Sequence, residues 1–194
     1  MATRDTGTEQ LIKDTAKRIF FSEGKLHATT QDIADAAGVN RTLLNYYFRS
    51  RDILFEQVVL EARAEMSAIM DSIFTAELEF KDKIQQMINI FMEQAMQFPY
   101  REMYVVMEFN RTEKIVPEEK KNKIRQFLKE INAEMEKGKI KKMDPRQFLM
   151  NLFALMAYPL ITNCLNKSLY NINDAEYLKL MKERKQLIFE MIYQ

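Results

Sequence analysis

The sequence predicts an all-α protein with a small N-terminal domain and a larger helical C-terminal domain. Glycine and proline are scarce, with 4 of each in 194 residues, which disfavours a loop-rich or all-β chain. Hydrophobic residues make up 47% of the chain, enough for a substantial core. Apolar residues recur at helical spacing along most of its length. We place the boundary between the predicted domains after residue 50, which gives domains of residues 1–50 and 51–194.

The N-terminal domain is expected to hold three helices, of which the last two are joined by a tight turn. Thr29, followed by Asp32 three residues later, is typical of a capping box that opens the second helix. Gly38 can adopt the left-handed backbone that ends this helix, and Asn40 is a favourable N-cap for the third helix, from Arg41 to Tyr47. A helix, a turn with glycine and a helix with a polar exposed face are typical of a helix-turn-helix, which places its last helix in the major groove of DNA.

Helices are predicted on both sides of this motif and through the rest of the chain. The helix after Ser50 has no glycine or proline, so it is suited to transmit a shift between the two domains. The predicted ranges are Thr8 to Glu23 before the motif, then Arg51 to Phe74, Phe80 to Phe98, Tyr100 to Asn110, Pro117 to about Lys137, a helix opened by Asp144 and Pro145, and Asp174 to about Tyr193.

One stretch raises the question of membrane insertion. Between Arg146 and Lys167 the sequence has no charged residue, a length close to that of a membrane span. Polar side chains and Pro159 interrupt it, so we expect no membrane insertion. We expect instead a helix with one face in the core and the other in a subunit interface, with the final helix as its partner. Cys164, among apolar neighbours, is expected to be an inert buried thiol.

Composition excludes several kinds of site. One cysteine cannot form a disulfide within the chain, and one histidine rules out a site of several histidines, so we expect no metal and no cofactor. The carboxylates fall on charged helical faces, and neither a catalytic Ser, His and Asp set nor a glycine-rich phosphate loop is evident, so an enzyme is not expected. The polar N-terminus has no apolar core segment, which favours a cytoplasmic location.

The formal net charge is only +1, although DNA-binding proteins are often strongly basic. The positive charge is concentrated where it is needed, because residues 41–51 hold Arg41, Arg49 and Arg51 and no acid.

The first third of the chain contains a long pattern of residues at fixed spacings. The pattern consists of Leu11-Ile12, Ala16 and Ile19-Phe20, followed by Gly24, Thr29, Ile33-Ala34, Ala37-Gly38-Val39, Leu44, Tyr47-Phe48, Ser50 and Leu54-Phe55. With this pattern the chain resembles the N-terminal domain of TetR-type transcriptional repressors. It departs from the family at Asn45, where Tyr is usual, at Thr42, where Gly is frequent, and at Arg51, where Lys is commoner. These departures bear on which bases are contacted.

The candidate DNA-binding residues are Thr29, Thr30, Arg41, Thr42, Asn45, Tyr46, Tyr47 and Arg51. Arg41 can bind a guanine edge or a phosphate, and Asn45 can pair with adenine. Tyr47 resembles the tyrosine with which the family contacts phosphate. Thr29 and Arg51 begin helices, whose backbone N–H groups can hold phosphates.

The resemblance also implies a homodimer and a pocket in the C-terminal domain for a small apolar or amphipathic effector. Flexible methionines and aromatic residues are suited to line such a pocket. The candidates are Met87, Phe91, Met103, Tyr104, Met107, Phe127, Met156 and Tyr158.

We therefore expect a dimeric regulator that binds double-stranded DNA at a palindromic operator and acts as a ligand-responsive repressor. Two alternatives remain open from the sequence. One is a DNA-binding regulator without an effector, and the other is a helical interaction protein without specific DNA binding.

Overall fold

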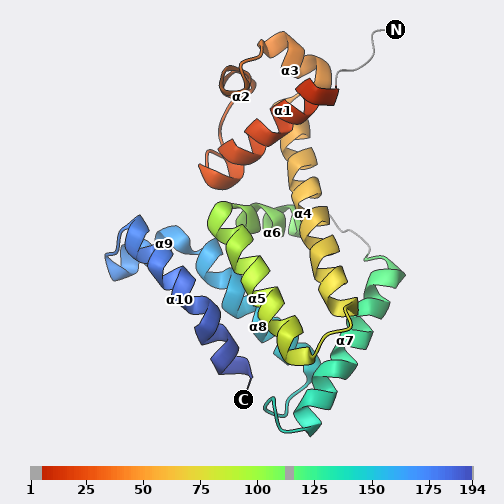
Figure 1. Cartoon of the computed structure of the whole chain (residues 1–194). Helices are drawn as coiled ribbons and strands as arrows, with labels where there is room; N and C mark the ends of the chain where they lie inside the picture. The colour runs from red at the N-terminus through yellow and green to blue at the C-terminus, as the bar shows by residue number, and fades with distance from the viewer. Residues whose placement is uncertain (1–5, 112–115, 194) are drawn as a thin grey trace. The chain divides into compact units, whose positions relative to one another are not determined.

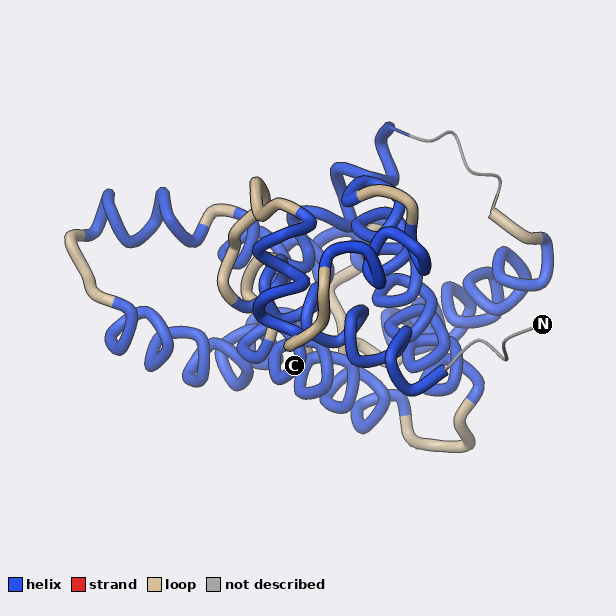
Figure 2. Tube along the Cα trace, turned by 90° about the horizontal axis from the view of Figure 1, so that it is seen from above, coloured by secondary structure: helices blue, strands red, loops and turns tan. Residues whose placement is uncertain are grey.

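The computed structural model describes residues 6–111 and 116–193. Within these residues every regular element is a helix and no strand is present, as Figures 1 and 2 show. The predicted all-α class is therefore confirmed.

Packing divides the chain into two units, one of Met1–Glu65 with Phe98–Thr112 and the other of Met66–Gln97 with Glu113–Gln194. The predicted division of function between residues 1–50 and 51–194 stays a prediction. The first unit contains α1 (Thr6–Lys17), a π-helical turn (Arg18–Ser22), α2 (Thr30–Ala37), α3 (Arg41–Phe48), the beginning of α4 (Arg51–Thr75) and α6 (Arg101–Arg111).

A single hydrophobic core holds the first unit together. Leu44 and Phe48 of α3 are buried in it. The residues buried with them come from α1, the π-helical turn, α2, α4 and α6, and include Ile12, Phe20, Ile33, Leu54 and Tyr104. The helix that presents polar side chains to solvent is thereby fixed through its apolar face.

The end of the first helix differs from the prediction. The sequence predicts one α-helix to Glu23, whereas the backbone widens into a π-helical turn at Arg18–Ser22. Three consecutive residues, Ile19, Phe20 and Phe21, are all buried there. A regular α-helix turns successive side chains by about 100°, so the wider turn helps to keep all three in the core.

Helix α6 packs on this turn. The backbone N–H of Tyr100 donates to the Phe21 carbonyl at 3.0 Å. The Tyr104 hydroxyl donates to the Gly24 carbonyl at 3.5 Å, and its ring packs edge-on against Phe55 at 5.5 Å between centroids. Tyr104 is therefore part of the core that supports the helix-turn-helix, and Tyr100 packs against that core.

The second unit contains the end of α4, then α5 (Phe80–Gln97), α7 (Glu118–Glu136), α8 (Pro145–Ile161), α9 (Asn163–Tyr170) and α10 (Asp174–Ile192). The bounds of α4, α5, α7 and α10 and the beginning of α8 agree with the predicted ranges to within a few residues, whereas α9 was not predicted as a separate helix. Helices α5, α8 and α10 contact one another, and α7 packs on α5 and α8. Stacked rings of Phe74, Phe80 and Phe127 lie in this core, with centroids 4.6 and 5.6 Å apart.

The charge-free stretch forms two helices rather than one. Helices α8 and α9 meet at Thr162 and are bent by 71°. Among the described residues no single helix is long and apolar enough to span a membrane. The bent pair of α8 and α9 reaches that length and apolar composition only when the two helices are taken together.

Cys164 lies on the outward side of α9 and is exposed, so the prediction of a buried thiol is wrong. The bend turns that side of the short helix to solvent.

The contact between Gly24 and Tyr100 generates a stability prediction. Gly24 has φ +67, and a Cβ there would lie 2.7 Å from Cζ of Tyr100. We expect Gly24→Ala to destabilise the protein by more than the roughly 1 kcal/mol cost of a left-handed alanine, because the tyrosine ring must also move.

The matched control is Gly138→Ala, with φ +73 and no other atom within 4 Å of the added carbon. Free energies of unfolding in urea compare the two variants. Equal losses would contradict the close packing of Tyr100 on Gly24.

Candidate nucleic-acid interface

The predicted capping box opens α2. The Thr29 hydroxyl accepts a hydrogen bond from the Asp32 backbone N–H at 3.2 Å, and the Asp32 carboxylate accepts from the Thr29 N–H at 2.7 Å. The hydrogen bond from the Thr29 backbone holds the pKa of Asp32 below its ordinary value. The backbone N–H groups of Thr29 and Asp32 therefore both have hydrogen-bond acceptors, which fixes the first turn of α2 at the surface.

The turn between α2 and α3 also follows the prediction. Gly38 ends α2 with φ 68 and ψ 27, the left-handed conformation. Asn40 then caps α3, with its side-chain oxygen accepting from the Leu43 N–H at 2.7 Å. Leu44 and Phe48 fix the other face of α3 in the core. The two helices thus form a helix-turn-helix whose second helix is held by its cap and by its buried side chains.

The predicted contact residues on α3 differ in their exposure to solvent. Arg41 and Thr42 are exposed at its beginning, and Tyr46 is 64% exposed. Asn45 is half-buried, and Tyr47 is only 8% exposed. The exposed residues share the outward face with the partly accessible Asn45, whereas Tyr47 contributes mainly to the core.

The two candidate residues at the beginning of α2 also differ in their exposure to solvent. Thr29 is exposed and Thr30 is half-buried. Their backbone lies at the N-terminus of α2, where the helix dipole is positive.

The Arg51 side chain turns inward. Its guanidinium lies over the rings of Phe20 and Phe55, at 5.0 and 4.9 Å from their centroids. It also donates to the backbone carbonyls of Leu26 and Ala28. The side chain therefore ties α4 to the loop before α2, and only the backbone of Arg51 remains a candidate for phosphate binding.

Arg49 is a cation that the candidate set did not include. It is exposed, with φ 60 and ψ −43, and the Ser50 N–H donates to the Phe48 carbonyl at 2.6 Å. These angles and this bond describe a γ-turn, a rare and strained conformation for a residue with a side chain. Within residues 6–111 and 116–193, neither Arg49 nor Arg41 forms an ion pair. The signal in the sequence was the acid-free run of residues 41–51.

The eight candidate effector residues lie in different cores. Met87, Phe91, Phe127 and Met156 are buried together in the core of the second unit. Tyr104 belongs to the core of the first unit, where Met103 packs on it, and Met107 is exposed. Tyr158 is exposed and borders two surface hollows of the second unit. Four of the eight candidates therefore lie in one core, whereas the other four lie in the first unit or on the surface of the second unit.

The cap at Thr29 generates a prediction about pH. The folded-state pKa of Asp32 is lowered from 3.8, so the carboxylate contributes stability above that pH and loses it as the pH falls through the folded value. We expect wild type to be more stable than Asp32→Asn near neutral pH, with the difference shrinking in acid. Thermal unfolding across a pH series measures it.

Asp35→Asn is the matched control, because Asp35 lies on the same helix and accepts a hydrogen bond from the Gln31 side chain, whereas Asp32 accepts from the Thr29 backbone N–H. The stability difference between wild type and Asp32→Asn should shrink from neutral to strongly acidic pH. If the difference is unchanged, the Asp32 carboxylate does not stabilise the cap as described.

Comparison with known proteins agrees with this geometry. Residues 12–58 match the family model of bacterial regulatory proteins, tetR family. Among curated proteins there is no match.

Solved structures share the fold over the full chain. A TetR family transcription regulator from Marinobacter aquaeolei VT8 has 14% identity, covers 100% of both chains and gives a TM-score of 0.59. The fatty acid degradation regulator FadR from Bacillus halodurans has 17% identity over 96% of each chain, with a TM-score of 0.60. A TetR-family transcriptional regulator from Haemophilus influenzae RD has 14% identity over 98% of this chain and 100% of that one, with a TM-score of 0.56.

At these identities the structural likeness establishes the fold, and the match over residues 12–58 establishes the type of DNA-binding domain. Residues 12–58 are therefore similar to the DNA-binding domain of bacterial regulatory proteins of the tetR family, and the whole chain shares the fold of solved TetR-family regulators.

Proposed function

We propose that this protein is a repressor that binds a palindromic operator as a homodimer and releases it when a small effector binds. The observation that carries the proposal is the outward face of α3. It presents Arg41, Thr42 and Tyr46 from a helix that is capped at one end and buried on its other face. Side chains on such a fixed helix can contact base edges at defined positions in the major groove.

The eight proposed DNA contacts divide into two kinds. Those on α3 (Arg41, Thr42, Asn45, Tyr46) are proposed to contact bases and nearby phosphates. Those at or near helix ends (Thr29, Thr30, Tyr47, Arg51) are proposed to hold the DNA backbone, the first two and Arg51 through backbone N–H groups. In this division the inward guanidinium of Arg51 supports the domain and does not bind DNA.

We propose that α4 couples the effector to the DNA, because each of its ends is tied to a different unit. In the first unit, Nζ of Lys13 lies 2.7 Å from the Glu61 carboxylate. In the second unit, the buried Lys83 donates to the Phe74 carbonyl at 3.2 Å and to Glu130 at 2.7 Å. An effector that prefers one packing of the second unit would shift α4 by its differential affinity for the two states.

The effector is proposed to be a small apolar or amphipathic molecule. The four neighbouring candidates, Met87, Phe91, Phe127 and Met156, form the part of the core where repacking would accommodate it. Methionine side chains adapt readily to such a change.

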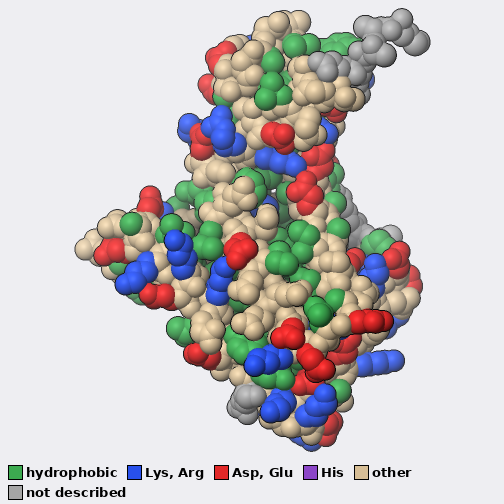
Figure 3. Space-filling view, in the orientation of Figure 1, with side chains coloured by type: hydrophobic (Ala, Val, Ile, Leu, Met, Phe, Trp, Pro, Cys, Tyr) green, Lys and Arg blue, Asp and Glu red, His purple; other side chains and the backbone are tan. Residues whose placement is uncertain are grey.

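The proposed dimer uses an apolar surface on α9 and along α10. Its exposed residues are Leu165, Leu169 and Tyr170 on α9 and Leu180 and Leu187 on α10. Exposed apolar patches of this kind mark interaction surfaces in soluble proteins. On the face drawn in Figure 3, hydrophobic side chains are exposed among acidic and basic ones in the second unit. Two copies that pair by a two-fold axis would present two α3 helices to a palindrome.

Selection of bound duplexes from a random DNA pool tests the DNA-binding proposal. We expect wild type to enrich a palindrome. Arg41→Ala should relax the preference at one position of each half-site and weaken binding about 5- to 100-fold, because a bidentate contact to guanine is lost.

Arg125→Ala is the control, since this exposed arginine lies on α7 and pairs with Glu118 and Asn122. It should leave the selected sequence unchanged. No enrichment by wild type at low salt would favour a helical interaction protein without specific DNA binding.

Sedimentation of Leu187→Glu tests the dimer. A charge placed in the proposed interface should shift the protein to monomer, because an unpaired carboxylate would be desolvated. Leu78→Glu places the same charge at another exposed leucine, in the loop between α4 and α5, and should leave the association state of wild type. Equal sedimentation of all three proteins would exclude this surface as the interface.

A further inference from the structure

The turn between α3 and α4 holds a strained arginine. Arg49 has φ 60 and ψ −43, and the Ser50 N–H donates to the Phe48 carbonyl at 2.6 Å. Such a γ-turn is rare for a residue with a side chain, and glycine adopts positive φ far more readily. Strained residues persist only where the surrounding structure holds them, and they are concentrated at functional sites. The strain therefore raises the question of what Arg49 does.

The chain is fixed on both sides of this turn. Before it, Phe48 is buried in the core, and the Arg49 N–H still donates to the Asn45 carbonyl at 2.9 Å. After it, the Ser50 hydroxyl accepts from the Ile53 N–H at 3.2 Å and so caps α4. The backbone of Arg49 cannot relax without moving a buried side chain or a helix cap. Its side chain therefore projects from a defined point of the surface.

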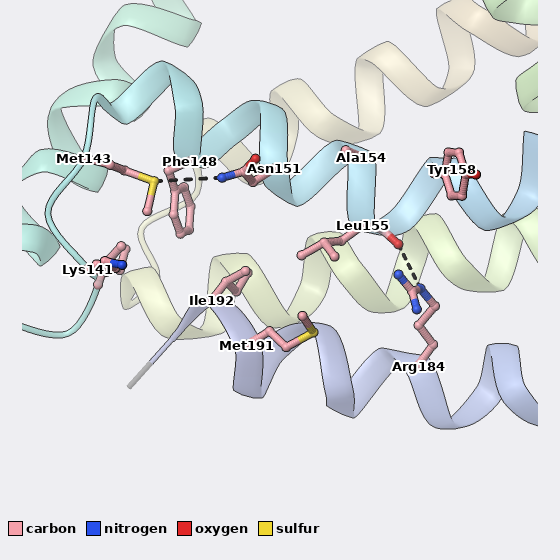
Figure 4. A pocket seen from close by; sticks show the side chains of 11 residues that line it. Lys141, Met143, Phe148, Asn151, Ala154, Leu155, Tyr158, Arg184, Met191 and Ile192 are labelled. Atoms are coloured by element: carbon pink, nitrogen blue, oxygen red, sulfur yellow. Dashed lines mark hydrogen bonds between the residues drawn. The ribbon is translucent and has the colours of Figure 1, made fainter.

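The guanidinium of Arg49 differs from those of arginines that support the fold. Nε of Arg184 donates to the Leu155 carbonyl at 2.9 Å, a bond drawn in Figure 4. Arg51 lies over two phenylalanine rings and pairs with Asp52 at 3.0 Å. Over the described part of the chain, the exposed Arg49 has neither an ion pair nor a hydrogen bond from its guanidinium. Its charge is therefore available to an anion without the loss of an existing contact.

Arg49 lies at the far end of α3 from the residue proposed to contact guanine. Arg41, Asn45 and Arg49 follow one another at intervals of four, which sets their Cα atoms along one side of the helix. From Arg41 to Arg49 the helix rises about 12 Å, and the major groove is also about 12 Å wide. With the beginning of α3 at the base edges, its end lies about one groove width away, where the sugar-phosphate backbone borders the groove.

We propose that Arg49 binds a DNA phosphate at the edge of the major groove, and that the strained turn is retained to hold it there. The inference rests on the proposed DNA binding and adds a contact to its eight residues. A guanidinium binds phosphate oxygens through two parallel N–H donors. Phosphate contacts set the position of a protein on the duplex, so Arg49 positions α3 for the base contacts of Arg41.

A role in the fold is the alternative for Arg49. The residue ends α3, and the dipole of a helix favours a cation beside its last carbonyls. At an exposed position this effect is smaller than the strain of a positive φ, so it does not explain an arginine where glycine would fit without strain. The two roles differ in what they predict, because only the phosphate contact makes DNA binding depend on salt.

Titration of labelled duplexes with the full chain at several salt concentrations tests the inference. One duplex carries the sequence that wild type selects, and the other carries a scrambled sequence of equal length. Arg49→Ala should weaken binding to both duplexes by a similar factor, about tenfold per contact at 0.1 M salt, because fewer counterions are released. The slope of log K against log salt should fall by about 1 per subunit. The sequence that Arg49→Ala selects should be that of wild type.

Three further variants separate the effects of charge and strain. Arg49→Lys keeps the charge and should keep the salt slope. Arg49→Gly removes the charge and the strain together, so it should lose DNA affinity like Arg49→Ala and melt about 2 to 4 °C above wild type. Arg125→Ala is the matched control, since it removes an exposed arginine from α7, and it should leave the salt slope unchanged.

An unchanged salt slope in Arg49→Ala, with DNA still bound by wild type, would overturn this inference and leave the proposed function in place. A loss confined to the selected duplex would overturn it as well, because Arg49 would then contact a base. If Arg49→Gly melts no higher than wild type, the turn is not retained against strain, and that part of the proposal is wrong.

Failure of the proposed function gives a different result. Wild type that enriches no palindrome contradicts the proposed operator, while the scrambled duplex still tests the phosphate contact of Arg49. Wild type that binds neither duplex at low salt contradicts both the proposed function and this inference.

Discussion

Both hydrophobic cores of this protein depend on one helix. Leu54, Val58 and Val59 of α4 are buried in the core of the first unit, whereas Met70 and Phe74, further along the same helix, are buried in the core of the second. Neither core is complete without its part of α4. One continuous helix therefore supplies part of each core, and the coupling that we propose between effector and DNA depends on this shared helix.

Much of this architecture could be predicted from the sequence, because the chemistry that sets it is local. The capping pairs at Thr29 and Asn40, the glycine that ends α2 and the helical spacing of apolar residues all act within a few positions of the chain. The π-helical turn and the bend at Thr162 could not be predicted in this way. They depend on partners distant in sequence, such as the N–H of Tyr100 on the Phe21 carbonyl.

The candidate sites show the same limit. Spacing placed Arg41 and Tyr46 on one helix face, and both are exposed there. It could not distinguish Arg51, whose guanidinium lies against two phenylalanine rings, from Arg49, whose side chain is exposed, because rotamers and packing decide which way a cation points. Methionine and aromatic residues at helical spacing likewise did not indicate which of the two cores each would join.

The position of α6 in the first unit has a consequence for how the protein is made. The core beneath the helix-turn-helix includes Tyr104, which follows Glu65, the last residue of α4 in that unit, by 39 residues. On the ribosome, α1 to α3 therefore emerge before the aromatic ring that completes their core, and the closing contact has a large sequence separation. A fragment that ends at Glu65 would expose the surfaces of Phe21 and Phe55 that Tyr104 covers, so the N-terminal helices cut out of the chain would form a less stable body than the same helices within it.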